Sequence, residues 1–260
     1  MILNYQRKPS ALSELKQSDK NIFIIHGLFG SFSNLSALAN ELHDLHHTIS
    51  VDLRNHGSSP HDDGMSYHEM ANDIFALADH LNIEAFSIVG HSMGGKVAMA
   101  CALLNPARVH KVVIADIAPV TYPDKHNDVF TGLSAVASVP IKTRQAADST
   151  LSAYIESPDL RQFLLKSLRK QGDFFQLQFN LTALISNYKA IRGWPEFDHV
   201  FNKEVLFIKG ANSDYIQPEY QTDILQHFPN AKAKVISHTG HWLHAEKPQT
   251  FNRLVKEFFQ

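Results

Sequence analysis

The chain has 260 residues, of which 44% are hydrophobic, and a formal net charge of −2. This length and composition allow one large hydrophobic core. The near-neutral charge leaves no basic surplus for a phosphate backbone, which argues against nucleic acid as a partner. No run approaches the roughly 18 apolar residues of a membrane-spanning helix, and the first ten residues lack the apolar core of a secretory signal. We therefore expect a cytoplasmic protein without membrane contacts.

Cysteine and histidine usage also argues against a redox or metal site. Cys101 is the only cysteine and has no partner for an internal disulfide. The sixteen histidines are scattered and lack acidic or cysteine residues at ligand spacing. We expect most histidines on the solvated surface, no metal site and no cofactor.

Apolar runs of strand length alternate with segments of helical periodicity along most of the chain. Apolar residues keep helical spacing at 35–45 and at 251–258. They also do so after Ser66, which forms a capping box with Glu69. The alternation predicts an α/β fold with a mostly parallel central sheet flanked by helices, whose ligand sites lie beyond the carboxyl ends of the strands. The predicted strands are 21–26, 48–53, 85–90, 111–115, 205–209 and 233–237.

The strand-helix alternation stops between about Pro119 and Asp198, where the sequence is helical and mixed in polarity. We interpret residues 119–198 as a helical cap inserted into a core domain made of residues 1–118 and 199–260. Aromatic residues of the cap can line the pocket or serve the cap's own packing. These aromatic residues are Tyr122, Phe130, Phe174, Phe175 and Trp194.

A G-x-S-x-G sequence, residues 90–94, follows a predicted strand and leads into a helical stretch. In this context the serine occupies a sharp turn that exposes its hydroxyl at the top of the sheet. The turn is strained, and side chains at its two glycines would collide with neighbouring backbone. The alternative is a glycine-rich turn with an incidental serine. We predict that Ser92 is a nucleophile.

A second glycine-rich turn, His26 to Gly30, follows the first predicted strand and so lies at the same end of the sheet. Acyl transfer creates an oxyanion, which backbone N–H groups can stabilise. We assign these donors to the N–H groups of Leu28 and Met93. The alternative is that the turn from His26 to Gly30 has a purely structural role.

A serine hydroxyl needs a base, and the base needs a carboxylate to fix its tautomer. His241 follows the last predicted strand, whereas we expect His238 and His244 to be orienting or surface residues. Asp116 follows the strand at 111–115 and Asp214 lies beyond the strand at 205–209. Both aspartates satisfy the chain order serine, acid, histidine, and spacing alone does not choose between them.

Arg54 follows the predicted strand at 48–53 and is a charged candidate for the pocket. It could meet an acidic leaving group such as a coenzyme phosphate. The alternative is an ion pair with Asp52 or with a loop carboxylate.

Together the two glycine turns and the segment 240–248 (GHWLHAEKP) resemble the α/β-hydrolase superfamily over the whole chain. Residues 52–59 (DLRNHGSS), 115–120 (ADIAPV) and 210–213 (GANS) are similar to the YbfF-type bacterial esterases and their eukaryotic abhydrolase relatives. This resemblance implies the α/β-hydrolase fold and hydrolysis of short-chain acyl esters or thioesters, acyl-CoA among them, under a helical cap. Because the D-I-A-P aspartate is the recurring acid of that group, the resemblance favours Asp116, whereas the wider superfamily favours the position of Asp214.

We expect a serine esterase acting through an acyl-enzyme on a small-molecule substrate, as a monomer or homodimer. One alternative is a C–C bond hydrolase or lyase, which uses the same three residue types on the same scaffold. A ligand-binding protein with little turnover is a second alternative, disfavoured by the complete set of candidate residues.

Overall fold

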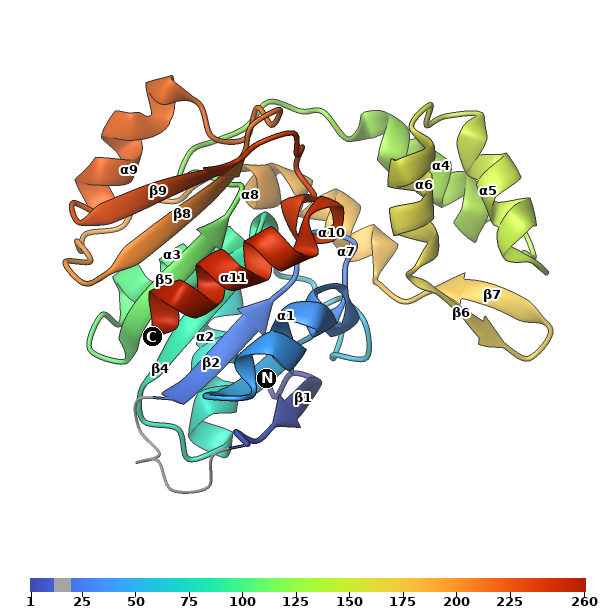
Figure 1. The fold of residues 1–260 in the computed structure, drawn as a ribbon. Helices are drawn as coiled ribbons and strands as arrows, with labels where there is room; N and C mark the ends of the chain where they lie inside the picture. The colour runs from blue at the N-terminus through green and yellow to red at the C-terminus, as the bar shows by residue number, and fades with distance from the viewer. Residues whose placement is uncertain (12–19) are drawn as a thin grey trace.

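The computed structural model describes residues 1–11 and 20–260. Its centre is a seven-stranded sheet with the order β1-β3-β2-β4-β5-β8-β9 (Figure 1). Only β1 pairs antiparallel, with β3, and every other neighbouring pair in this sheet is parallel. The predicted mostly parallel α/β sheet is thus confirmed. The strands are β1 (Tyr5–Lys8), β2 (Asn21–Ile25), β3 (His47–Val51), β4 (Phe86–His91), β5 (Val109–Ala115), β8 (Val205–Gly210) and β9 (Ala231–Ile236).

Helices cover both faces of this sheet, and the central strands are therefore apolar on both sides. Helices α2 (Tyr67–His80) and α3 (Met93–Leu104) pack on one face, against side chains such as Phe23 and Ile88. Helices α1 (Ser36–Leu42) and α11 (Pro248–Phe259) pack on the other face, against Ile24 and Val89. The remaining core helices are α9 (Gln221–His227) and α10 (Leu243–Glu246), with short 3-10 turns η2 (Phe32–Leu35) and η3 (Pro218–Tyr220).

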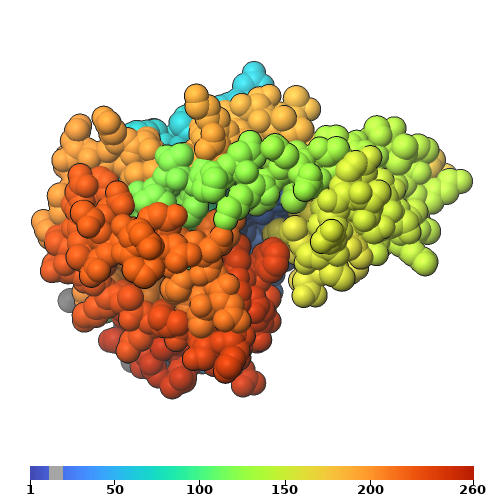
Figure 2. All heavy atoms as spheres, turned by 90° about the horizontal axis from the view of Figure 1, so that it is seen from above, coloured from blue at the N-terminus to red at the C-terminus, as the bar shows by residue number. Residues whose placement is uncertain are grey.

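The chain leaves the sheet after β5 and returns to it at β8, and the intervening elements form the cap (Figure 1). The cap contains α4 (Asn127–Ala137), α5 (Arg144–Ser152), α6 (Pro158–Leu165), α7 (Leu181–Ser186) and α8 (Tyr188–Arg192), with a hairpin of β6 (Leu168–Gln171) and β7 (Phe174–Leu177). Figure 2 shows α4, α5 and α6 projecting from one side of the core.

Two features of the fold differ from the sequence-based expectation. Strand β1 has the sequence YQRK, which carries no apolar run, and it is held by its ladder with β3. The cap is not purely helical, because β6 and β7 form an antiparallel hairpin. Within the described residues, no helix combines the length and apolarity needed to cross a membrane.

Candidate active site

Ser92 occupies a sharp turn between β4 and α3. Its φ of 55° and ψ of −123° lie in a region that L-residues rarely adopt. The turn is held by a hydrogen bond from Ser92 N–H to the carbonyl of Ala115 at 3.0 Å. A Cβ on Gly90 would lie 2.1 Å from the carbonyl oxygen of Gly94, and a Cβ on Gly94 would lie 2.4 Å from that of His26. Both glycines are therefore sterically required.

His241 connects Ser92 to Asp116. Its Nε2 lies 2.9 Å from Ser92 Oγ, and its Nδ1 lies 2.8 Å from Asp116 Oδ2. Ser92 follows β4, Asp116 follows β5 and His241 lies in the loop after β9, so three strand ends supply the three side chains. The structure thus joins these residues in one continuous hydrogen-bonded chain.

The carboxylate of Asp116 is fully buried, with 0% exposure, and its oxygens accept three hydrogen bonds. Gly210 N–H donates to Oδ1 at 2.9 Å, and the hydroxyl of Ser213 and the ring of His241 both donate to Oδ2. A carboxylate buried without such donors would be costly. Asp116 has a φ of 53°, which turns its side chain toward this cluster of donors.

Asp214, the competing aspartate, lies elsewhere. Its side chain is 60% exposed and pairs with Lys125, with 2.5 Å between Oδ2 and Nζ. The hydrogen bond from Lys125 lowers the pKa of Asp214. The structure therefore brings Asp116, and not Asp214, into hydrogen-bonding contact with His241.

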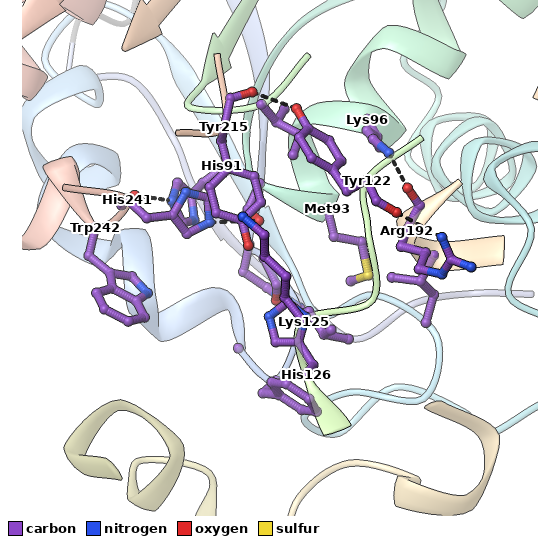
Figure 3. A pocket seen from close by; sticks show the side chains of 18 of the residues that line it. His91, Met93, Lys96, Tyr122, Lys125, His126, Arg192, Tyr215, His241 and Trp242 are labelled. Atoms are coloured by element: carbon purple, nitrogen blue, oxygen red, sulfur yellow. Dashed lines mark hydrogen bonds between the residues drawn. The ribbon is translucent and has the colours of Figure 1, made fainter. Parts of the chain in front are cut away.

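Several residues that sequence reasoning did not select hold His241 in place. The Tyr215 ring stacks on the imidazole, with 3.9 Å between centroids. Tyr122 donates its hydroxyl proton to the Tyr215 carbonyl at 2.5 Å, as Figure 3 shows. His91 Nε2 donates to the His241 carbonyl at 2.8 Å. These contacts, like that of Ser213, join residues far apart in the sequence, so no local pattern indicates them.

His244 is part of the same packing. Its ring lies 4.4 Å from that of His91 between centroids, and burial lowers its pKa to about 3. It is therefore a neutral, half-buried residue that contacts His91 and borders the cavity.

The predicted oxyanion turn faces Ser92. A Cβ on Gly27 would lie 3.1 Å from Ser92 Cβ, so the two turns are in contact. Within the described part of the chain, no hydrogen bond uses the N–H of Leu28 or the N–H of Met93. Both donors are thus free for a ligand.

Two buried histidines fix the shape of this turn. His26 Nδ1 donates to the Gly27 carbonyl at 2.7 Å. His56 Nε2 accepts from Phe29 N–H at 3.2 Å, while its Nδ1 donates to the Arg54 carbonyl at 3.0 Å. Burial lowers the pKa of both rings, that of His56 to about 3, so both are neutral near pH 7. Four histidines depart from the expectation of solvated rings, since they are at most 9% exposed: His26, His46, His56 and His91.

Arg54 does not reach the pocket. Its guanidinium group is 7% exposed and pairs with Asp73 of α2, with 2.6 Å between Nε and Oδ2. The ion-pair alternative is correct, since Arg54 also pairs with the loop carboxylate of Asp62 at 3.7 Å. Asp52 is not a partner, because its carboxylate accepts hydrogen bonds from Phe32 and Ser58 N–H.

A cavity of about 410 Å³ opens above Ser92 between the core and the cap. Of the five cap aromatics considered above, only Tyr122 lines it. The other wall residues combine apolar side chains with a few polar groups, including Leu28, Met93, Ile117, Lys125, His126, Val129, Leu160, Phe163, Tyr188, Ile191 and Arg192. Among the described residues, no cluster of histidine, cysteine and acidic side chains is arranged to hold a metal ion.

Comparison with known proteins agrees with the fold. The α/β-hydrolase-fold family matches residues 20–248. The chain therefore belongs to the α/β-hydrolase family, as its sequence motifs indicated.

The most similar proteins include esterases. A putative esterase/lipase of Haemophilus influenzae is 42% identical, covering 99% of this chain and 88% of that protein. Esterase YbfF of Escherichia coli is 40% identical over 94% of each chain. The solved structure of a marine microorganism esterase is 35% identical, with a TM-score of 0.91 over 99% of both chains. The resemblance to YbfF-type esterases is thus confirmed.

Proposed function

We propose that this protein hydrolyses short-chain carboxylic esters and thioesters, acyl-CoA among the latter, through an acyl-enzyme formed on Ser92. Its class, an ester hydrolase, follows from its family and its esterase relatives. The observation that carries the mechanism is the hydrogen-bonded chain from Ser92 Oγ through His241 to Asp116 at the base of the cavity.

In the first half of the reaction, Ser92 Oγ attacks the acyl carbon while its proton passes to His241 Nε2. His241 then gives that proton to the departing alcohol or thiol, which leaves the acyl group on Ser92. A water molecule repeats the sequence: its oxygen attacks the acyl carbon, its proton passes to His241, and Ser92 is released with the carboxylic acid. Asp116 keeps the Nδ1–H tautomer and stabilises the imidazolium formed in each half.

The free N–H groups of Leu28 and Met93 are suited to stabilise the negative oxygen of each tetrahedral intermediate. One lies on the turn that His26 and His56 hold, and the other begins α3 directly after the nucleophile. The start of a helix adds a favourable dipole for negative charge.

The size and lining of the cavity support a small substrate with an apolar acyl group. About 410 Å³ of space, with Met93, Val129 and Leu160 on its walls, has room for an aliphatic acyl chain. Polar groups such as Lys125 and Arg192 lie on the same walls and can contact the alcohol or thiol part.

Hydrolysis of a series of p-nitrophenyl esters of increasing acyl length, with parallel acyl-CoA assays, tests this function. We expect turnover of the short acyl esters by the wild type and a loss of about 10⁵-fold or more in Ser92→Ala. A dienoate ketone substrate assayed in parallel reports on C–C bond hydrolysis. No ester or thioester turnover by a folded wild type would overturn the proposal.

A further inference from the structure

Lys96 is a buried cation one turn of helix beyond Ser92. It lies in the first turn of α3 and is only 1% exposed. Its ammonium group lies 4.7 Å from the centroid of the Tyr122 ring and 5.6 Å from that of Tyr67. Among the described residues, no carboxylate forms an ion pair with it. A lysine so placed is costly unless its charge is used.

The three N–H donors of Lys96 are all used by backbone carbonyls. Nζ donates to Val120 O at 2.7 Å, to Arg192 O at 3.0 Å and to Gly193 O at 2.7 Å. Figure 3 shows Lys96 and Arg192 joined in this way. An ammonium group has three donors, so its hydrogen-bonding capacity is complete.

The three carbonyls belong to the two connections between core and cap. Val120 lies between β5 and α4, where the chain enters the cap, while Arg192 ends α8 and Gly193 follows it, where the chain leaves. The two connections also bind each other, because Tyr122 N–H donates to Arg192 O at 2.9 Å and the Arg192 guanidinium donates to Tyr122 O at 2.8 Å. One side chain of the nucleophile helix thus holds both ends of the cap.

The connections held by Lys96 also form part of the cavity wall. Tyr122 lies on the first connection, just after Val120. Ile191 and Arg192 end α8, where the second connection begins. All three residues line the cavity. The nucleophile and both oxyanion donors belong to the core. An acyl chain that extends beyond the core part of the cavity therefore meets these residues, and an acetyl group extends less far toward them than a longer chain.

Burial lowers the pKa of Lys96 to about 7, while the three carbonyl dipoles and two ring faces stabilise the ammonium form. An amine would offer only two donors to three carbonyls. The charged form is thus the one that fits this site.

We propose that Lys96 is a positioning residue that fixes the cap over Ser92 and thereby determines how well the longer acyl chains bind. This proposal rests on the proposed esterase function. It assigns no contact between Lys96 and the reacting atoms.

The test compares KM and kcat for p-nitrophenyl acetate and p-nitrophenyl hexanoate in wild type, Lys96→Met and Lys203→Met. Methionine keeps the length of the side chain without the charge. Lys203 is the matched control, because its Nζ donates to the carbonyls of Pro106 and Val109 at 2.8 and 2.7 Å, away from the cavity. In Lys96→Met we expect the ratio of KM for hexanoate to KM for acetate to rise about tenfold relative to wild type. In Lys203→Met we expect the wild-type ratio.

A second variant keeps the proposal falsifiable if Lys96→Met does not fold. Lys96→Arg retains a cation, but its larger head must displace the two connections, so the same shift in the KM ratio is expected. An unchanged ratio in a folded Lys96 variant, or an equal loss of kcat for both esters, would overturn the proposal. Labelling of each variant by a fluorophosphonate reports on Ser92 separately, and failure of the wild type to hydrolyse either ester would instead refute the proposed function.

Discussion

Replacing Asp116 with asparagine moves the ring proton of His241 from Nδ1 to Nε2 and leaves the size of the side chain at position 116 almost unchanged. Because the Gly210 N–H faces Oδ1, the amide oxygen of asparagine takes that position and its NH₂ group faces His241 Nδ1 and the Ser213 hydroxyl. An NH₂ group donates to Nδ1, which forces the ring proton onto Nε2. Nε2 then cannot accept the proton of Ser92, from which it lies 2.9 Å away. We expect kcat to fall about 10⁴-fold, or ~5 kcal/mol of transition-state stabilisation.

The assay is the hydrolysis of p-nitrophenyl butyrate by Asp116→Asn and Asp214→Asn at one pH near neutrality. Asp214 is exposed and pairs with Lys125, so Asp214→Asn should lose less than about tenfold. Circular dichroism serves as the control for the folding of both variants. An Asp116→Asn enzyme within tenfold of the wild type, together with a large loss in Asp214→Asn, would refute the assignment.

Three further predictions follow from the same site. Ser213→Ala removes a hydrogen bond to the buried carboxylate of Asp116, and kcat/KM for p-nitrophenyl butyrate should fall about tenfold. His56 has a pKa of about 3, below the ordinary 6.5, so its contribution to stability is complete above pH 6.5 and is lost as the pH falls toward 3. Between pH 7 and pH 5 the wild type should therefore lose free energy of unfolding, measured in urea. His56→Gln should lose about 2 kcal/mol less over the same range. Gly94→Ala places a Cβ 2.4 Å from the His26 carbonyl oxygen, and thermal unfolding should show a loss of about 3 kcal/mol.

Each of these three predictions can be contradicted by a specific result. Full activity of Ser213→Ala would mean that Gly210 and His241 alone satisfy Asp116. Equal pH dependence in His56→Gln and wild type would mean that folding does not lower the pKa of His56. For the glycine, Gly172→Ala is the control, because a Cβ there meets nothing within 4 Å and only its φ of 60° costs about 1 kcal/mol. Equal losses in the two glycine variants would contradict the steric account.

The sequence predicts the central strands well because they are buried on both faces. The runs predicted at 21–26 and 205–209 agree with β2 and β8 to within one residue at each end. Strand β1 carries no hydrophobic signal, since its residues are stabilised by ladder pairing with β3, which depends on tertiary structure. The cap hairpin of β6 and β7 is short and partly exposed, so its pattern does not differ from that of a surface helix.

Chain order and strand ends predict that Ser92 and His241 lie close together, and His241 Nε2 is 2.9 Å from Ser92 Oγ. The residue pattern does not predict which of Asp116 and Asp214 contacts His241. Strands β5 and β8 are neighbours in the sheet, and the two aspartates follow their carboxyl ends. The left-handed backbone of Asp116 aims its side chain inward, and no residue pattern reports that angle. No residue pattern reports the contacts of Ser213, Tyr215 and Lys96 either, because these contacts join distant parts of the chain.

The central claim is that an acyl group is carried on Ser92, and mass spectrometry of the quenched reaction tests it most directly. The wild type is mixed with p-nitrophenyl butyrate, quenched in acid within milliseconds, and digested for peptide mapping. We predict a butyryl group on the peptide that contains Ser92, absent from Ser92→Ala. Steady turnover with no acylated peptide, or a butyryl group on another residue that persists in Ser92→Ala, would contradict the account.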